Sequence, residues 1–455
     1  MELIAIILAA GEGKRMKSAL PKVLHPVAGR PMLGHVLETC DELGADRKLV
    51  VVGRGREAVE SWLDGRAETV HQIEQLGTAH AVLAARPSLA EETAVFVLSG
   101  DTPLITAATL SEVFERFKSG RPAAVMVTGD LAEPFGYGRI FRDSSGAVSR
   151  IVEEKDATAE EKAVTEVNTG IYCFDREKLF EALGEIDDDN QQGEYYLTDV
   201  VAVLRAAGET VMTVKAEADE VMGVNSRVDL VEVERTMQSR LRRGLMDAGV
   251  TFIMPETTYL AVDVEIGRDT VVLPQCFLES GTRVGEGARI GPGVRLAGTQ
   301  VGDGAEVSYS VLRDCEIGMQ ARVGPYCSLR PGTVLLDGVK AGTFVEIKNT
   351  EVGAGSKVPH LSYMGDAVIG EDVNVGAGSI TCNYDGAEKH RTVIEDRAFL
   401  GSDTMLIAPV NIGKGAATGA GSSISHDVPA DSLAVERAEQ RTIPGWAKRR
   451  RAKRK

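Results

Sequence analysis

LAAGEGKRMKSALPK, residues 8–22, follows directly on the apolar run Leu3–Leu8. An unbroken apolar run of this length is typical of a buried parallel strand. The chain then turns at two glycines and supplies a cluster of cations: Lys14, Arg15, Lys17 and Lys22. Bare backbone amides can approach an anion closely, so the stretch predicts a phosphate site at the end of the first strand of an α/β fold. The alternative is an ordinary strand-to-helix turn with solvated basic side chains.

The spacing in this loop excludes two common phosphate-binding motifs. No serine or threonine follows Lys14, as the P-loop requires, and Met16 occupies the third glycine position of a G-x-G-x-x-G fingerprint. The loop instead resembles the signature L-A-A-G-x-G-T-R-M, then P-K, of sugar-1-phosphate nucleotidyltransferases. It departs from that signature at Lys14, where the family has threonine. The resemblance implies nucleotide contacts in this loop from Leu8, Ala9, Ala10, Gly11, Arg15 and Lys22.

Length, net charge and cysteine content limit the classes of protein to which this chain can belong. A chain of 455 residues exceeds one ordinary core, so two domains are expected. A net charge of −16 disfavours nucleic acid as a partner, so small anionic substrates require locally concentrated cations. The six cysteines are dispersed, which indicates thiols of a reducing cytosol. Met1 and Glu2 lead directly into the first strand, and no apolar stretch reaches the length of a membrane span. We therefore expect a cytoplasmic enzyme with no membrane partner.

Residues 1–227 alternate between apolar, strand-like runs and amphipathic segments. The strands are expected at 49–52, 94–98, 123–127 and 170–174, and the helices at 32–43, 78–85, 107–117 and 197–207. This alternation predicts a Rossmann-like α/β domain with a mostly parallel sheet, helices on both faces and ligands at the carboxyl ends of the strands.

Residues 249–455 follow a different period. Aliphatic residues recur every six positions in three series: Ile266–Leu296, Ile317–Leu335 and Ile394–Ile424, the last interrupted by Thr418. Small residues follow many of them four positions later. A period of six fits neither a helix nor an alternating strand, but it fits a parallel β-helix with one short strand per hexapeptide. The pattern resembles the left-handed β-helix of hexapeptide acyltransferases, which form trimers. An ordinary β-sandwich is the alternative.

Three further segments complete the organisation of the chain. Residues 228–248 carry one apolar stripe, which predicts a helical linker between the two domains. Residues 330–350 and 382–392 interrupt the count of six, and we expect them to be binding loops. The last eight residues, KRRRAKRK, are interpreted as a solvated, disordered tail, with binding of an acidic partner as the alternative.

A metal site is predicted beside the phosphate loop. Asp101 follows the apolar run 94–98, so it lies at a strand end that faces the same cleft. Mg²⁺ prefers oxygen ligands, and the Asp101 carboxylate with the Asn225 amide carbonyl would suffice beside substrate phosphates and water. Arg15 and Lys22 would stabilise the charge on the α-phosphorus and on departing pyrophosphate. A turn-forming aspartate is the alternative for Asp101.

The resemblance to nucleotidyltransferases extends through several motifs of the first half. It implies that Gln72, Gly77 and Thr78 read the uracil edge, and that Ser99, Gly100 and Asp101 border the nucleotide. The same resemblance implies that the sugar is held by Gly138, Glu153 and Asn168.

A second site is predicted within the repeats. KVPHLSYMGDAVIG (357–370) places His360 near Tyr363, and NVGAGSITCNYDGAEKHRT (374–392) follows. Histidine is suited to remove a proton from an amine near neutral pH, which attack on a thioester requires. The alternative is a surface histidine with no chemical role.

Both sets of motifs, in this order, resemble the family of bifunctional acetyltransferase/uridylyltransferases that make UDP-N-acetylglucosamine, a cell-wall precursor. The resemblance implies that His360 is the general base and that acetyl-CoA acetylates glucosamine-1-phosphate before UTP reacts with the product. Sugar phosphate contacts are implied for Arg330, Lys348, Tyr363 and Asn374. Acetyl-CoA contacts are implied for Ala377, Asn383, Tyr384, Lys389, Ser402, Ala420 and Arg437.

Two rival interpretations differ in what the second half does. In one, the repeats only assemble subunits or bind a regulator, and the first domain alone is an enzyme. In the other, the chain is a trimeric adaptor that senses nucleotide without turnover. His360 and Asn383 disfavour the first, because a scaffold needs only aliphatic steps and turns. We expect a homotrimer, since flat sheet faces bury one another when three chains pack together.

Overall fold

The protein is described from a computed structural model that covers residues 2–89 and 93–453. Met1 and the last two residues of the basic tail, Arg454 and Lys455, lie outside these ranges. The chain divides into two compact units, Met1–Arg240 and Leu241–Lys455.

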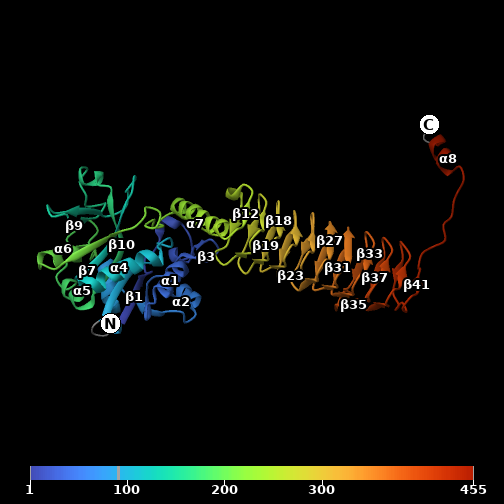
Figure 1. Ribbon diagram of the computed structural model, residues 1–455, viewed down its shortest axis with the longest axis horizontal. Coiled ribbons are helices and arrows are strands. Elements are labelled where there is room, and N and C mark those ends of the chain that lie inside the picture. The colour runs from blue at the N-terminus through green and yellow to red at the C-terminus, as the bar shows by residue number, and fades with distance from the viewer. Residues whose placement is uncertain (1, 90–92, 454–455) are drawn as a thin grey trace. The chain divides into compact units, whose positions relative to one another are not determined.

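The first unit is built on a sheet with the strand order β11-β7-β10-β6-β1-β4-β5 (Figure 1). The bounds of these strands are β1 Glu2–Leu8, β4 Arg47–Val52, β5 Glu68–His71, β6 Thr93–Ser99, β7 Ala124–Asp130, β10 Glu166–Asp175 and β11 Val211–Lys215. Neighbours in this order are parallel, except that β10 runs antiparallel to β6 and β7. The predicted mostly parallel sheet is confirmed, with one reversed strand.

Both faces of this sheet are covered by helices, as predicted. Alternate residues of β1 enter two separate cores, Ile4 and Ile6 on one face and Leu3, Ala5 and Ile7 on the other. This explains the unbroken apolar run in β1. The helices that contribute to the first core are α3 (Thr78–Ala85), α5 (Arg176–Ala182) and α6 (Asp199–Ala206); those of the second are α1 (Met32–Leu43), α2 (Arg56–Leu63) and α4 (Ala107–Gly120).

The order of the strands positions a ligand site at the end of β1. This strand lies between β4 and β6, so the strand order reverses there, and ligands bind at such a point in open α/β sheets. The Ala9 amide donates a hydrogen bond to the Val51 carbonyl at 2.9 Å, and the Gly100 amide donates to the Leu8 carbonyl at 2.9 Å. The segments after β1, β4 and β6 therefore meet at one edge.

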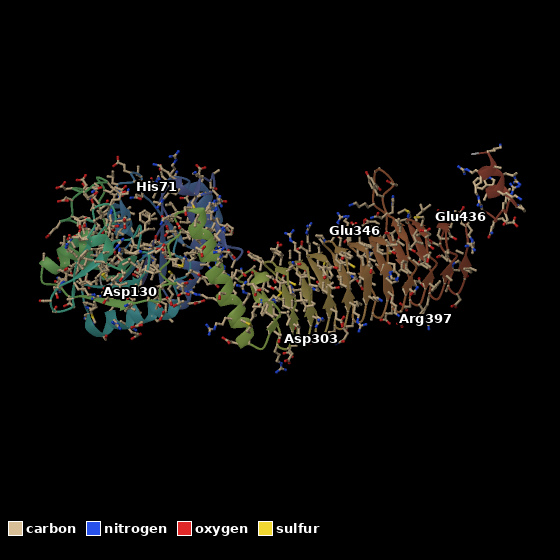
Figure 2. All side chains as sticks on the ribbon, turned by 90° about the horizontal axis from the view of Figure 1, so that it is seen from above. His71, Asp130, Asp303, Glu346, Arg397 and Glu436 are labelled. Carbon is tan, nitrogen blue, oxygen red and sulfur yellow. The ribbon has the colours of Figure 1, made fainter. Side chains whose placement is uncertain are left out.

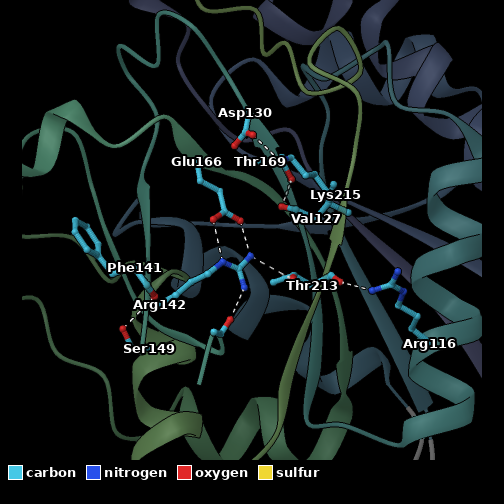
Figure 3. A network of polar contacts seen from close by, with 11 residues as sticks. Arg116, Val127, Asp130, Phe141, Arg142, Ser149, Glu166, Thr169, Thr213 and Lys215 are labelled. Carbon is cyan, nitrogen blue, oxygen red and sulfur yellow. Dashed lines mark hydrogen bonds and ion pairs between the residues drawn. The ribbon is translucent and has the colours of Figure 1, made fainter. Parts of the chain in front are cut away.

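A polar network joins four elements around β10 (Figure 3). Arg142 of β8 (Arg139–Arg142) forms two hydrogen bonds with Glu166 of β10, and β8 also pairs with β9 (Val148–Val152). Arg142 also donates to the Thr213 hydroxyl of β11, and the Thr213 carbonyl accepts from Arg116 of α4 at 2.7 Å. Partly exposed pairs of this kind contribute at most about 1 kcal/mol each. They connect β8 and β10 with β11 and α4, which pair with neither of these two strands.

The second unit is a parallel β-helix with three faces (Figure 1). The first face runs from β12 (Thr251–Phe252) to β41 (Leu433–Ala434), the second from β13 (Tyr259–Leu260) to β40 (Ser423–Ile424), and the third from β14 (Glu265–Ile266) to β38 (Val410–Ile412). Val272 pairs in parallel with Ile290, one turn of three hexapeptides later. The aliphatic series is buried in one continuous core. The small residues four positions later, such as Thr270 and Ala288, are buried at the turns.

The expected interruption at 330–350 is wrong. Ala341 and Ile347 are fully buried and continue the inward series, within β27 (Lys340–Thr343) and β28 (Glu346–Lys348). The alanine at this step is small and does not stand out in an aliphatic pattern. Residues 383–391, between β34 (Ile380–Cys382) and β35 (Thr392–Ile394), do leave the β-helix, and an isolated bridge joins Tyr384 to Lys389.

Two corners of the β-helix hold most of the residues of the second predicted site. The first corner joins each strand of the first face to the next strand of the second face, and the second corner joins the second face to the third. Figure 2 shows Glu346, on the second face, at the edge of the β-helix opposite Asp303 and Arg397, which lie where the third face turns into the first.

Helix α7 (Arg227–Asp247) forms where the linker helix was predicted. Val233 and Met237 are buried, and Leu241 and Leu245 pack against the β-helix core, so the boundary between the units falls inside this helix. The basic tail forms an exposed helix, α8 (Trp446–Ala452), in place of the expected disorder. Among the described residues, no helix combines the length and apolar character of a membrane span.

Candidate functional site

A cavity of about 590 Å³ opens at the end of β1. Most of the predicted nucleotide residues line it: Leu8, Ala9, Ala10, Gly11, Arg15, Lys22, Gln72, Gly77, Thr78, Ser99, Asp101 and Asn225. Gly100, Gly138, Glu153 and Asn168 do not. The phosphate loop, the uracil motif and the aspartate after β6 therefore meet in one place, although 217 positions separate Leu8 from Asn225 in the numbering.

Three polar groups converge at one end of this cavity. The Lys22 ammonium forms an ion pair with the Asp101 carboxylate and lies 3.4 Å from the Asn225 amide oxygen. Ser99 donates a hydrogen bond to the other Asp101 oxygen at 2.7 Å. Burial acts to raise the pKa of Asp101, but the charge and hydrogen bond of Lys22, together with the hydrogen bonds from Ser99 and the backbone, lower the pKa below its usual value. Asp101 is thus held as a carboxylate.

The glycines of the phosphate loop are required by its geometry. Gly13 has φ of 60°, and a Cβ atom there would lie 2.7 Å from Cβ of Lys22. The buried side chain of Met16 closes the short helical turn Lys14–Met16 that comes next. A larger residue at position 13 would therefore displace Lys22 from Asp101.

The residues expected to read uracil form a connected group. The Gln72 amide donates to the Gly77 carbonyl at 3.0 Å, and the Thr78 hydroxyl accepts from the Leu197 amide at 3.0 Å. Gly77 has φ of 113°, and a Cβ atom there would lie 2.5 Å from the Tyr195 carbonyl oxygen. A side chain at position 77 would clash with the backbone.

Sequence reasoning missed three polar residues of this cavity, Glu12, Gln75 and Glu194. Gln75 donates to the Ala10 carbonyl at 2.7 Å, which ties the uracil motif to the phosphate loop. Its place in the motif QLGTAH could have identified it. Glu194 also lines the cavity, but no motif marked it.

Gly138, Glu153 and Asn168 form a separate group. The backbone amide of Asn168 donates a hydrogen bond to the Gly138 carbonyl at 2.9 Å. A Cβ atom on Gly138 would lie 3.4 Å from the Glu153 carboxylate. Thr198 donates to Glu153 at 3.1 Å. Burial raises the pKa of Glu153 despite this hydrogen bond. The structure thus brings the three predicted sugar residues together.

In the β-helix, His360 belongs to a column of residues at the first corner. It ends β30 (Lys357–His360) and pairs with Thr343 of the preceding turn. The Gly378 amide donates to the His360 carbonyl, the Asp403 amide to Ala377 and the Gly421 amide to Ser402. His360, Ala377, Ser402 and Ala420 therefore occupy equivalent positions in successive turns, about 4.8 Å apart. Arg437 donates to the Ala420 carbonyl at 2.7 Å and extends the column.

A second cluster lies at the second corner. Asn383 donates to the Asp366 carboxylate and lies 3.5 Å from the Tyr363 hydroxyl. The Lys348 ammonium lowers the pKa of Lys389 by close side-chain contact and by its charge, and Asp366 opposes this shift. The ammonium groups of Lys348 and Lys389 thus lie close together, which favours binding of a phosphate between them.

Arg330, Tyr384 and Asn374 complete the residues predicted for the second half. Arg330 lies one turn before Lys348 and forms an ion pair with Glu346 at 2.9 Å. The Tyr384 hydroxyl donates to the Gly386 carbonyl, and Asn374 pairs with Lys357 on the first face. The implied acetyl-CoA residues therefore divide between the two corners. Tyr363 begins the strand β31 (Tyr363–Gly365) between them.

No group of three or more His, Cys, Asp or Glu side chains suited to hold a metal is found among residues 2–89 and 93–453. A metal at the cavity would depend on Asp101, an amide oxygen and the substrate itself.

Known proteins match both halves of this arrangement. Residues 5–167 match the family model of the MobA-like NTP transferase domain, and residues 391–426 match that of the hexapeptide repeat of succinyl-transferase. The bifunctional protein GlmU of Heliobacterium modesticaldum is 52% identical over 439 residues, which cover 96% of this chain and 96% of that protein. The chain belongs to the GlmU family.

Two further relatives show the same extent of similarity. GlmU of Desulfitobacterium hafniense (strain Y51) is 49% identical and covers 98% of this chain and 99% of its own. GlmU of Syntrophomonas wolfei is 47% identical with the same coverage. GlmU membership confirms the predicted fold class and the predicted bifunctional enzyme, an acetyltransferase and uridylyltransferase with small-molecule substrates and a role in cell-wall synthesis. Nucleotidyl transfer of this kind generally uses a divalent metal.

Proposed function

We propose that uridylyl transfer takes place in the cavity at the end of β1, and acetyl transfer around His360. The convergence of Lys22, Asp101 and Asn225 beside the phosphate loop carries the first assignment, because phosphoryl chemistry requires positioning and neutralised charge. The column from His360 to Ala420 supports the second assignment.

Mg²⁺ is the metal that the donor set at the cavity favours. The Asp101 carboxylate and the Asn225 amide oxygen both face the Lys22 ammonium, so they already provide a place for a cation. Both are hard oxygen donors, and one or two such ligands suffice for Mg²⁺ when phosphates and water complete its shell. The ion would supply charge neutralisation to the triphosphate.

In uridylyl transfer, a phosphate oxygen of N-acetylglucosamine-1-phosphate attacks the α-phosphorus of UTP. The new P–O bond forms as the bond to pyrophosphate breaks, and no enzyme nucleophile is needed. Arg15 and Lys22 stabilise the charge that develops at this phosphorus and on the leaving group. Gln72 and Gly77 hold the uracil, and the group of Glu153 holds the sugar.

In acetyl transfer, the amine of glucosamine-1-phosphate attacks the thioester carbonyl of acetyl-CoA. The C–N bond forms, the C–S bond breaks, and His360 passes the proton from the amine to the departing thiolate. Arg330, Lys348 and Lys389 bind the sugar phosphate, with Tyr363 and Asn374 against the sugar. Asn383, Tyr384 and the column at the first corner hold acetyl-CoA. This step precedes uridylyl transfer.

A homotrimer completes this second site. His360 and Lys348 lie at the two ends of the second face, and a neighbouring chain packed along that face would enclose the substrates between them. Three aromatic rings form a column at the first corner. Tyr326 stacks on Phe344 with ring centroids 5.3 Å apart and lies tilted against Tyr309 at 5.7 Å, yet each side chain is about half exposed. An exposed aromatic column of this kind is suited to pack against another chain, which supports the same assembly.

We assign uridylyl transfer to residues 1–227, the linker to 228–248 and acetyl transfer to 249–455, in a cytoplasmic enzyme. Separate assays of the two half-reactions test the assignment, with glucosamine-1-phosphate and N-acetylglucosamine-1-phosphate each offered to the purified protein. Thiol release from acetyl-CoA with the first sugar and pyrophosphate release from UTP with the second are expected. If no thiol is released, the alternative interpretation, in which the repeats are only a scaffold, would be supported.

A further inference from the structure

Glu12, in the middle of the phosphate loop, has two cationic partners. Its carboxylate lies 2.6 Å from the Lys14 ammonium and 2.9 Å from the Arg54 guanidinium. The Glu12 side chain is 26% exposed, whereas those of Lys14 and Arg54 are 84% and 77% exposed. Lys14 and then Arg54 lower the pKa of the Glu12 carboxyl. A mostly buried carboxylate thus lies between two exposed cations.

Glu12 lies at the boundary between two cavities, with Gln72 and Gln75. Lys14 lines the nucleotide cavity, whereas Arg54 lines a neighbouring cavity of about 840 Å³ together with Arg56 and His71. Glu12 lines both cavities. One of its partners therefore faces the nucleotide, and the other lies outside the nucleotide site.

A carboxylate in a phosphate loop needs a compensating charge. An unpaired Glu12 would repel a triphosphate, and Lys14, at the position where the signature of the nucleotidyltransferases has threonine, supplies a cation that this signature lacks. The triphosphate carries more negative charge than the single Glu12 carboxylate, so transfer of the Lys14 ammonium from Glu12 to the phosphates favours the complex. The exchange leaves Glu12 neutralised only if Arg54 stays in place.

We propose that Lys14 binds the β- and γ-phosphates of UTP, and that Arg54 is a positioning residue that neutralises Glu12 when Lys14 moves to the phosphate. This inference rests on uridylyl transfer in the cavity at the end of β1. In the free enzyme Lys14 is paired with Glu12. In the complex Lys14 contacts the part of UTP that leaves as pyrophosphate.

The two directions of the reaction test this assignment. UTP and pyrophosphate carry the phosphates in question, whereas UDP-N-acetylglucosamine does not carry the γ-phosphate and keeps its β-phosphate on the sugar side. Lys14→Gln should raise KM for UTP and for pyrophosphate about three- to tenfold and leave KM for UDP-N-acetylglucosamine within twofold. The increase should shrink at high salt.

A double-mutant cycle separates the role of Arg54 from a direct contact. Arg54→Gln should raise KM for UTP with little change in kcat, and Glu12→Gln in the same chain should cancel that rise, because no anion then remains to be neutralised. Arg56→Gln is the matched control, since Arg56 lines the neighbouring cavity and contacts His71 at 3.1 Å. It should leave all three KM values unchanged.

Two outcomes overturn the inference. Equal increases for pyrophosphate and UDP-N-acetylglucosamine in Lys14→Gln, or no increase at all, would remove Lys14 from the phosphates. An increase in Arg54→Gln that persists in the double variant would make Arg54 a direct ligand. Wild-type protein with no pyrophosphate release would instead refute the proposed uridylyl transfer itself. An unfolding transition of the first unit at the wild-type temperature, followed by calorimetry, shows that this unit is folded in each variant.

Discussion

The ammonium of Lys22 and the carboxylate of Asp101 form an ion pair at the end of β1, with only 15% and 13% of their side chains exposed. One residue comes from the phosphate loop and the other from the loop after β6. Removal of either partner leaves a charge that is mostly withdrawn from water, so both activity and local stability depend on the pair.

Replacement of Asp101 should abolish one activity and spare the other. Asp101→Asn keeps the shape of the side chain but removes the anion, so uridylyl transfer should fall at least about a hundredfold. Pyrophosphate release from UTP measures it. Ser99→Ala, which removes one hydrogen bond to the same carboxylate, should have a much smaller effect. Full activity of Asp101→Asn would contradict its role in holding the metal.

His360→Ala should produce the reverse pattern. Loss of a general base lowers the rate about 10²- to 10⁴-fold, so thiol release from acetyl-CoA should fall by this factor while uridylyl transfer is unchanged. His426→Ala is the control, because His426 is an exposed histidine of the same β-helix that contacts Ser425. Loss of both activities in a folded His360→Ala variant would refute the model of two separate sites.

The two lysines at the second corner should respond to each other. Because Lys348 lowers the pKa of Lys389, more of the Lys389 amine is neutral at a given pH than in an isolated lysine. Lys348→Met should raise that pKa and slow the reaction of Lys389 with an amine-modifying reagent at pH 8 to 9, as mass spectrometry would measure. Glucosamine-1-phosphate should protect Lys389 in the wild type. Unchanged labelling in both cases would exclude a shared phosphate site.

The buried carboxylate of Glu153 should lower the stability of the folded chain at neutral pH and contribute to sugar binding. A carboxyl whose pKa is raised on folding binds a proton more tightly in the folded chain, so wild-type stability should rise as pH falls from neutral towards that pKa. Glu153→Gln should be more stable than wild type at pH 7 and should lose this gain on acidification, as urea denaturation at pH 5 and pH 7.5 would show. Its KM for N-acetylglucosamine-1-phosphate should increase. A variant that is less stable at pH 7 would show that the buried carboxylate is net stabilising.

Sedimentation equilibrium should give three times the chain mass of 48.6 kDa. Phe344→Asp places a charge in the exposed aromatic column and should weaken the assembly and acetyl transfer together, while uridylyl transfer persists. Phe399→Asp, at a residue that is 53% exposed on the first face, is the matched comparison. A monomer with full acetyl transfer would contradict a site completed by a neighbouring chain.

Elements with a repeating pattern were predicted well, whereas the direction of one strand and one step of the β-helix were not. The helices Met32–Leu43 and Thr78–Ala85 have the predicted bounds, and each contributes several buried apolar residues to a core beside the sheet. The reversal of β10 could not be predicted, since an apolar strand buried on both faces reads the same in either direction. The prediction of a break at 330–350 was wrong because an alanine, Ala341, occupies an inward position of the series. Its small side chain does not stand out in an aliphatic pattern.

The two folds and the chemistry of each loop follow from the amino-acid sequence alone, since unbroken apolar runs, periods of 3.6 and six residues and a glycine-cation loop are local properties of a chain. Only the tertiary structure decided which side chains meet. Asn225 reaches Lys22 because the chain after β11 returns to the end of β6, where the Val224 amide donates to the Asp101 carbonyl at 3.0 Å. His360 aligns with Ala420 because each turn of the β-helix repeats the position of the last. Such contacts depend on strand order and register. Both are set by the packing of the whole fold, so they cannot be predicted from a short stretch of sequence.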